Sequence, residues 1–102
     1  MSYTIDSRTY VSPNHSARPH GEISALVIHT TGGAWDSDAV WLCTPSTKVS
    51  CHYAIPPSGS TIYQLVADTQ AAWHAGTSSY QGRSNWNDFS IGIEVSHKEG
   101  SA

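Results

Sequence analysis

The sequence Ala-Leu-Val-Ile-His-Thr-Thr-Gly-Gly at residues 25–33 decides the fold that we expect. Four apolar residues, a histidine, two threonines and a glycine pair form the pattern of a β-strand that ends in a turn. Successive side chains of a strand point to opposite faces, so Leu26 and Ile28 would share one face while Val27 and His29 share the other. We therefore expect His29 at the mouth of a sheet. It is either a core histidine satisfied by backbone groups or a functional group, and the strand alone leaves both open.

A second strand with the same alternation is predicted at residues 90–96. Its isoleucines and valine would point to one face, whereas Gly92, Glu94 and Ser96 would point to the other. The glycine leaves space over the sheet beside the carboxylate of Glu94. The alternative is an amphipathic strand whose Glu94 simply faces water.

One helix is predicted between these strands. Asp36 or Ser37 is expected to cap it, and Pro45 to end it after two to three turns. The positions expected to face inward are Val40, Trp41 and, as a third candidate, Cys43.

The remaining parts of the sequence show weaker patterns and predict less regular structure. Residues 49–55 and 61–66 read as a β-hairpin joined by the turn Pro-Pro-Ser-Gly. Residues 1–24 read as an extended arm over the sheet edge, with one short strand within residues 3–11. Residues 67–88 read as a loop whose aromatic side chains either contact a carbohydrate or peptide, or cover a small core.

Composition limits the possible partners. At 102 residues, with 38% hydrophobic and 13% charged residues, the chain is expected to form one small globular domain. A net charge of −3 with five lysines and arginines argues against a nucleic-acid or anionic-membrane partner and favours a neutral, polar one. Without a membrane-length apolar segment or a signal peptide, the chain is expected to be cytoplasmic as synthesised. Cys43 and Cys51 are expected to be free, with a short bridge between them as the alternative.

Five blocks in this order resemble the zinc-dependent N-acetylmuramoyl-L-alanine amidases. They are Ile-His-Thr-Thr-Gly-Gly at 28–33, Val-Ser-Cys-His-Tyr-Ala-Ile at 49–55, Gly-Ser-Thr-Ile-Tyr-Gln-Leu-Val at 59–66, Ala-Trp-His-Ala-Gly at 72–76 and Asn-Asp-Phe-Ser-Ile-Gly-Ile-Glu-Val at 87–95. The family includes bacterial cell-wall recycling amidases and phage endolysins, and is similar in fold to the peptidoglycan recognition proteins. The resemblance covers roughly residues 23–97. It implies an α/β fold with a mixed central β-sheet flanked by helices.

The resemblance also implies roles for single residues. His29 matches the first zinc ligand and Glu94 the general base of the recycling amidases. His74, with Trp73 before it, matches the wall of the substrate groove, and Asn87 matches the loop beside that groove. Position 51, where some phage members place a tyrosine near the metal, is a cysteine in this chain, so Cys51 is expected to have no catalytic role.

The family's remaining zinc ligands, a histidine and an aspartate or cysteine with a lysine nearby, lie in a C-terminal segment, whereas this sequence ends at Ala102. We therefore expect residues 1–102 to form a single amidase-like domain lacking its C-terminal part, with residues 1–24 as an arm and 25–102 as the N-terminal portion of the catalytic domain. His52 could face the groove. The histidines at 15, 20 and 97 have no counterpart among the family's ligands. A sheet face left without its helix would be open to self-association or to a partner chain.

Three hypotheses follow from the sequence. The first is a zinc amidase that cleaves between the N-acetylmuramoyl group and L-alanine of peptidoglycan or muropeptides, acting on the cell wall if it is released as an endolysin. The second is a muropeptide-binding module without hydrolysis. The third is a structural fragment that needs a partner chain.

Overall fold

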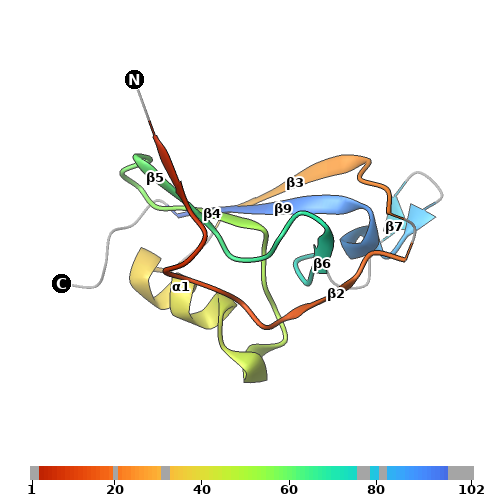
Figure 1. The fold of residues 1–102 in the computed structure, drawn as a ribbon, viewed down its shortest axis with the longest axis horizontal. Coiled ribbons are helices and arrows are strands. Elements are labelled where there is room, and N and C mark those ends of the chain that lie inside the picture. Colours follow the sequence, from red (N-terminus) through yellow and green to blue (C-terminus); the bar gives the residue numbers. More distant parts are fainter. Residues whose placement is uncertain (1–2, 20, 31–32, 76–78, 81–82, 97–102) are drawn as a thin grey trace.

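The computed structural model describes residues 3–19, 21–30, 33–75, 79–80 and 83–96. They form a mixed five-stranded sheet with α1 (Trp35–Leu42) on one side of it (Figure 1). Across the sheet the strands follow the order β1 (Thr4–Asp6), β5 (Thr61–Gln64), β4 (Tyr53–Ile55), β9 (Ser90–Val95) and β3 (Ala25–Thr30). β9 is parallel to both of its neighbours, whereas β4 and β5 are antiparallel. The α/β fold with a mixed central sheet is confirmed.

The pairing of β3 with β9 sets the positions of the predicted polar residues. Val27 lies opposite Gly92, and His29 lies opposite Glu94. Directly paired residues of neighbouring strands point to the same face of a sheet. His29 and Glu94 therefore share the face that the sequence predicted for each of them.

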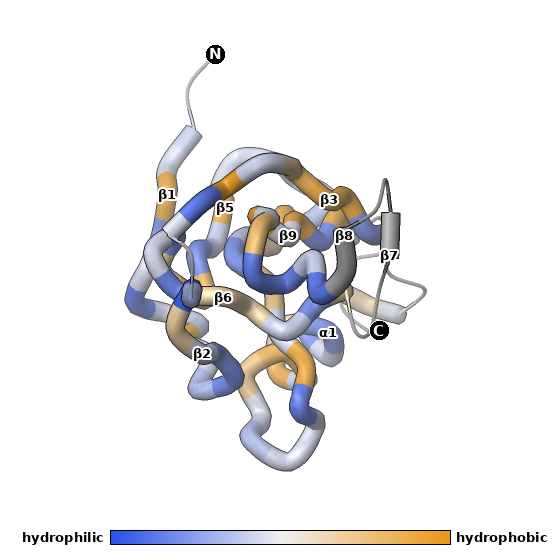
Figure 2. The backbone as a smooth tube through the Cα atoms, turned by 90° about the vertical axis from the view of Figure 1, so that its right-hand side faces the viewer, coloured by the Kyte–Doolittle hydropathy of each residue, from blue (hydrophilic) through white to orange (hydrophobic). Residues whose placement is uncertain are grey.

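The other face of β3 is open in the part of the chain that the structure describes. Leu26 is 67% exposed and Ile28 is 66% exposed, although both lie in the middle of the strand. Figure 2 shows β3 as a hydrophobic stretch at the outside of the molecule. Apolar side chains grouped on an exposed sheet face are a typical association surface.

We expect the 102-residue chain to self-associate through this face. Replacing Leu26 and Ile28 together with threonine gives both positions a β-branched side chain, the shape that strands favour, and removes apolar surface. Sedimentation velocity should then show a shift toward monomer. A wild-type chain that stays monomeric as its concentration is raised would contradict this prediction.

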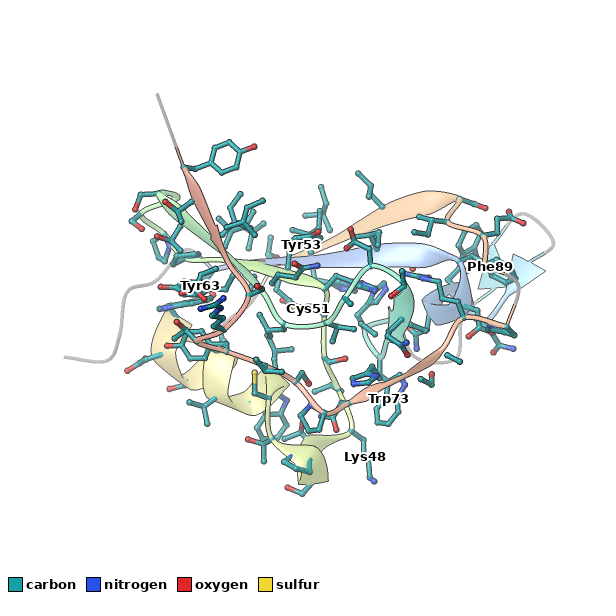
Figure 3. All side chains as sticks on the ribbon, in the orientation of Figure 1. Lys48, Cys51, Tyr53, Tyr63, Trp73 and Phe89 are labelled. Atoms are coloured by element: carbon teal, nitrogen blue, oxygen red, sulfur yellow. The ribbon has the colours of Figure 1, made fainter. Side chains whose placement is uncertain are left out.

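The core lies between the sheet and α1, where Figure 3 places Cys51. Its buried apolar members are Leu42, Cys51, Ala54, Leu65, Val66 and Ala72. Both cysteines are free, as expected. Burial raises the pKa of the Cys51 thiol, with a smaller contribution from Glu94, so this thiol is a packing group.

The orientation that we expected for the helix is wrong. Ala39 and Leu42 are its buried residues, whereas Val40 and Trp41 are 61% and 60% exposed. The helix begins at Trp35 after Ala34, without a side-chain cap, and at 3.6 residues per turn the positions 39 and 42 share one face. The expected capping by Asp36 or Ser37 is therefore also wrong. Cys43 follows the helix and packs partly buried against the core.

The arm and the predicted loop contain more strands than expected. β1 confirms a short strand within residues 3–11, at the edge of the main sheet. A further pair joins β2 (His15–Ala17) to β6 (Gln70–Ala72), and residues 67–88 also contain β7 (Ser79–Tyr80), β8 (Arg83–Ser84) and the 3-10 helix η2 (Trp86–Asp88). The arm is thus anchored by backbone pairing to a segment more than fifty residues later in the chain.

The hairpin is confirmed, with both strands shorter than expected. β4 begins at Tyr53 and not at residue 49, and β5 ends at Gln64 and not at residue 66. The amide of Ser50 donates to the Trp73 carbonyl and that of His52 to the Gly92 carbonyl, both at 2.9 Å. Between α1 and this segment lies the short 3-10 helix η1 (Pro45–Thr47). No helix in the described ranges is long and apolar enough to span a bilayer.

Candidate active site

The imidazole of His74 packs directly over Gly92. A Cβ atom built on Gly92 would lie 2.4 Å from Cγ of His74, a distance that no side chain tolerates. The space that the sequence predicted beside Glu94 is therefore filled by His74. Asn87 fixes the backbone under this ring, because its Oδ1 accepts hydrogen bonds from the amides of His74 (3.0 Å) and Ala75 (2.8 Å).

A chain of hydrogen bonds links the two histidines to β9. Nε2 of His29 lies 3.1 Å from Nδ1 of His74, and Nε2 of His74 lies 3.0 Å from Oγ of Ser90. The Ser90 hydroxyl donates its proton to the Trp86 carbonyl at 2.6 Å, so its oxygen accepts from His74 Nε2–H. Neutral His74 then accepts at Nδ1 from His29 Nε2–H. This assignment leaves the ring lone pair of His29 on Nδ1, the atom through which it could bind a metal.

Burial keeps His74 neutral. It lowers the pKa of His74 to about 4, with smaller contributions from His29 and His52. Since the neutral ring has one donor and one acceptor nitrogen, it fits between the Ser90 oxygen and the His29 N–H. His74 thus lies where the resemblance puts it and also holds His29 in position.

His52 is a core residue. Its side chain is fully buried, its Nδ1 accepts from the Gly92 amide at 3.1 Å, and its Nε2 lies 2.7 Å from the Gln70 carbonyl and 3.0 Å from Arg18 Nη2. Burial lowers its pKa. Both ring nitrogens are engaged with the protein, so the suggestion that His52 could face the groove is not supported.

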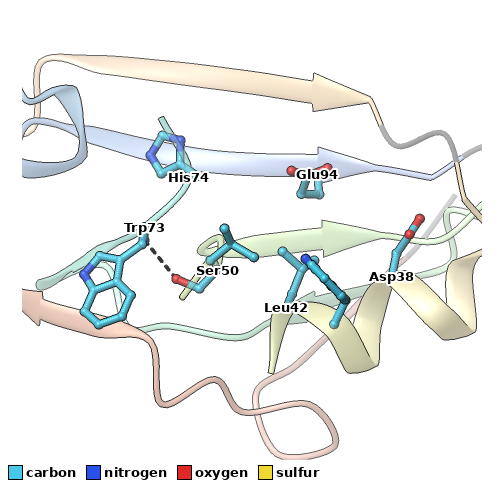
Figure 4. Close-up of a pocket in the computed structure, with 8 residues that line it drawn as sticks. Asp38, Leu42, Ser50, Trp73, His74 and Glu94 are labelled. Atoms are coloured by element: carbon cyan, nitrogen blue, oxygen red, sulfur yellow. Dashed lines mark hydrogen bonds between the residues drawn. The ribbon is translucent and has the colours of Figure 1, made fainter. Parts of the chain in front are cut away.

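A pocket of about 200 Å³ opens beside His74 and Glu94. In Figure 4, Glu94 on β9 and Asp38 on α1 lie toward one end of the view and His74 and Trp73 toward the other, where the Trp73 amide donates to Ser50. The lining side chains come from α1, the segment before β4, the segment after β6 and β9; they are Asp38, Trp41, Leu42, Val49, Ser50, Trp73, His74 and Glu94. This mixture of aromatic, apolar and few polar groups is typical of a small-molecule site.

The carboxyl group of Glu94 holds its proton more tightly than usual. Burial raises its pKa, and the negative charge of Asp38 adds to the shift. Asp38 is itself positioned by Ser96, whose hydroxyl lies 3.3 Å from Asp38 Oδ2. A carboxyl group with a raised pKa beside a pocket is suited to accept and return a proton.

The sequence interpretation missed several residues that build this site. Ser90 could have been found, because it shares the strand face of Gly92 and Glu94. Arg18 gave no such signal, yet its guanidinium donates to the carbonyls of Asp68, Asp88 and Ser90 at 2.8, 3.1 and 2.9 Å. These hydrogen bonds connect residues 1–24 to the loop at Asp68 and to the beginning of β9, close to the site.

The residues present supply only part of a zinc site. His29 offers one ligand nitrogen, but no group of three histidine, cysteine, aspartate or glutamate residues within the described ranges could hold a metal ion. A zinc site in a hydrolase needs three protein ligands and an open position. His15 is exposed on β2, and the histidines at 20 and 97 lie outside the described residues.

The fold and this site define a family. The family model described as N-acetylmuramoyl-L-alanine amidase matches residues 19–101, and the chain belongs to this family. The resemblance drawn from the five sequence blocks is thereby confirmed.

Individual relatives agree with this assignment. The chain is 40% identical over 113 residues to the 1,6-anhydro-N-acetylmuramyl-L-alanine amidase AmpD of Citrobacter freundii, covering 91% of this chain and 59% of AmpD. It is 36% identical over 102 residues to the N-acetylmuramoyl-L-alanine amidase AmiD of Escherichia coli, covering 94% of this chain and 34% of AmiD. A structure of E. coli AmiD with the substrate anhydro-N-acetylmuramic acid-L-Ala-D-gamma-Glu-L-Lys matches with a TM-score of 0.67 and 35% identity, over 88% of this chain and 34% of that one. The chain thus spans 59% of the length of AmpD and 34% of the length of AmiD.

Proposed function

We propose that this chain carries the catalytic face of an amidase that hydrolyses the bond between the N-acetylmuramoyl group and L-alanine in peptidoglycan or muropeptides. The observation that carries the proposal is the pairing of His29 with Glu94 on adjacent parallel strands, beside a pocket that His74 also lines. The pairing brings an imidazole and a carboxyl group to the same face of the sheet, which supports roles for them as metal ligand and proton acceptor. Amide hydrolysis requires both kinds of group.

Glu94 is proposed as the general base. Its carboxylate would take a proton from the attacking water and return it to the leaving amine of L-alanine, so that the carboxylate is regenerated in each cycle. The raised pKa supports this role, because a more basic carboxylate is a better proton acceptor.

Zinc is proposed as the cofactor, with Nδ1 of His29 as one of its ligands. A bound zinc ion would supply a water of lowered pKa and a positive charge that polarises the substrate carbonyl. His74 would hold His29 in the required tautomer through the 3.1 Å contact. The other ligands are not found among the described residues.

The remaining predicted site residues are proposed to serve the substrate pocket. Trp73 and His74 line it, and the backbone of Trp73 is held by Ser50, whose Oγ accepts from the Trp73 amide at 2.9 Å. Asn87 supports the pocket from behind by holding the amides of His74 and Ala75. Direct contact of Asn87 with substrate stays a prediction.

A muropeptide-binding module is the second candidate. The incomplete set of metal ligands among the described residues favours it, because the pocket can bind a ligand without a metal. Both candidate functions involve the same muropeptide ligand. An amidase cleaves this ligand, whereas a binding module leaves it intact.

The test takes a form of the protein with a complete set of zinc ligands, incubates it with an N-acetylmuramoyl-L-alanyl peptide, with zinc or with a chelator, and assays the alanine amino group that hydrolysis frees. An amidase releases this amine only in the presence of zinc. Saturable binding of the muropeptide without release of the amine would favour the binding module and refute the proposed hydrolysis.

A further inference from the structure

Trp41 is an exposed aromatic residue that connects the pocket to a second hollow. Its side chain is 60% exposed on α1 and lines the pocket that contains His74 and Glu94. It also lines a hollow of about 540 Å³ on the outer side of α1 and η1. We call this hollow the α1 groove; its lining includes Asp36, Val40, Trp41, Thr44 and Thr47. A ligand that fills the pocket and extends past Trp41 would enter the α1 groove.

The α1 groove combines an apolar surface with hydrogen-bond acceptors. Val40 and Trp41 form the apolar part. The hydroxyl of Thr44 donates to the Val40 carbonyl at 2.6 Å, and that of Thr47 lies 2.9 Å from the Trp41 carbonyl. With their protons used by the backbone, both hydroxyl oxygens can only accept from a ligand, as can the carboxylate of Asp36.

This lining selects the chemistry of the occupant. Sugar rings present an apolar face that can pack on an indole and hydroxyl groups that can donate to the acceptors. The peptide stem is less suitable, because its carboxylates would meet Asp36 and further acceptors. The lining contains no lysine or arginine within the described ranges that could pair with a carboxylate.

We propose that the α1 groove is a glycan subsite, in which Trp41 stacks against a neutral N-acetylated sugar next to the muramoyl residue in the pocket. The inference rests on the proposed function and adds a substrate class to it: glycan-linked peptidoglycan is preferred over a muropeptide with a single sugar.

The test compares three probes by isothermal titration calorimetry. They are an N-acetylmuramoyl tripeptide, the same tripeptide with N-acetylglucosamine added to the muramoyl group, and a tetramer of N-acetylglucosamine that has no peptide. We expect the added sugar to strengthen binding to the wild type about tenfold. Trp41→Ala should remove this gain and weaken tetramer binding about tenfold. Because Trp41 also lines the pocket, binding of the single-sugar muropeptide should weaken too, but by a smaller factor than binding of the two-sugar muropeptide. Trp41→Phe should restore part of the gain.

Tyr3→Ala is the matched control, because Tyr3 is an aromatic residue with 64% exposure that lies outside both hollows. It should leave the binding of all three probes unchanged. If Trp41→Ala weakened the single-sugar and two-sugar muropeptides equally, or its effect grew with the length of the peptide, the glycan subsite would be refuted.

The same titrations separate this inference from the proposed function. A wild-type protein that binds the single-sugar muropeptide but neither gains from the second sugar nor binds the tetramer would refute the subsite alone. A protein that binds the tetramer through Trp41 but does not release the alanine amine would support the subsite while the proposed hydrolysis fails.

Discussion

Glu94→Gln is expected to reduce turnover roughly a hundredfold or more, the scale of general acid–base catalysis. Glutamine keeps the size and hydrogen-bonding shape of the side chain but cannot accept the proton of the attacking water. The measurement is the rate of alanine amine release from a muropeptide, in a form of the protein with a complete set of zinc ligands. Muropeptide binding and zinc content should be retained.

The stability of this variant provides a second readout. Burial, followed by the charge of Asp38, raises the pKa of Glu94, so the folded state favours its protonated form. Wild-type stability therefore decreases as the pH rises through the folded-state pKa of Glu94, and the neutral glutamine avoids this loss. Glu94→Gln should be at least as stable as the wild type at neutral pH. The control is Glu22→Gln at an exposed position, which should change neither the rate of amine release nor the stability. Near-normal turnover of Glu94→Gln would exclude Glu94 as the general base.

Gly92→Ala is expected to have the next largest effect. The new methyl group would lie 2.4 Å from His74 Cγ, so the ring must move and its contact with His29 must change. We expect turnover to fall roughly a hundredfold, as displacements of about 1 Å in an active site can cause. Overpacking should also reduce the free energy of unfolding by about 1–3 kcal/mol, measured by urea denaturation.

A double-mutant cycle with His74→Ala separates this clash from other effects of the alanine. Without the imidazole ring the methyl group has space, so adding Gly92→Ala to His74→Ala should cost little stability. The lower conformational freedom that alanine loses on folding, compared with glycine, favours the double variant by up to about 0.5–1 kcal/mol. An equal loss in both backgrounds would show that the contact with His74 is not the cause.

The central part of the site could be predicted because it depends on strand alternation. In β3 and β9 every second residue points to the same face, so one register fixes Val27, His29, Gly92 and Glu94 together. The predicted space over Gly92 was also correct. That the imidazole ring of His74 fills this space depends on the fold of residues 72–75, and strand alternation does not predict that fold.

The parts that could not be predicted depend on contacts between distant segments. The helix presents Ala39 to the core and two larger apolar residues, Val40 and Trp41, to the outside, the reverse of what hydrophobicity suggests. The three-residue strands β2 and β6 stabilise each other across more than fifty residues, and neither has a strand pattern of its own. Arg18 lies in a stretch that reads as a flexible arm, and its role depends on carbonyl groups that only the folded chain brings together.

The central claim is that the site hydrolyses the amide bond between the muramoyl group and L-alanine, and the position of an oxygen label tests it most directly. The reaction is run in ¹⁸O-labelled water on an N-acetylmuramoyl-L-alanyl peptide, and the products are identified by mass spectrometry. We predict one labelled oxygen in the carboxylate of the muramoyl lactyl group and an unlabelled peptide with a free alanine amino group. Label in a carboxylate of the peptide, or intact substrate in a protein whose zinc site is complete, would contradict the account.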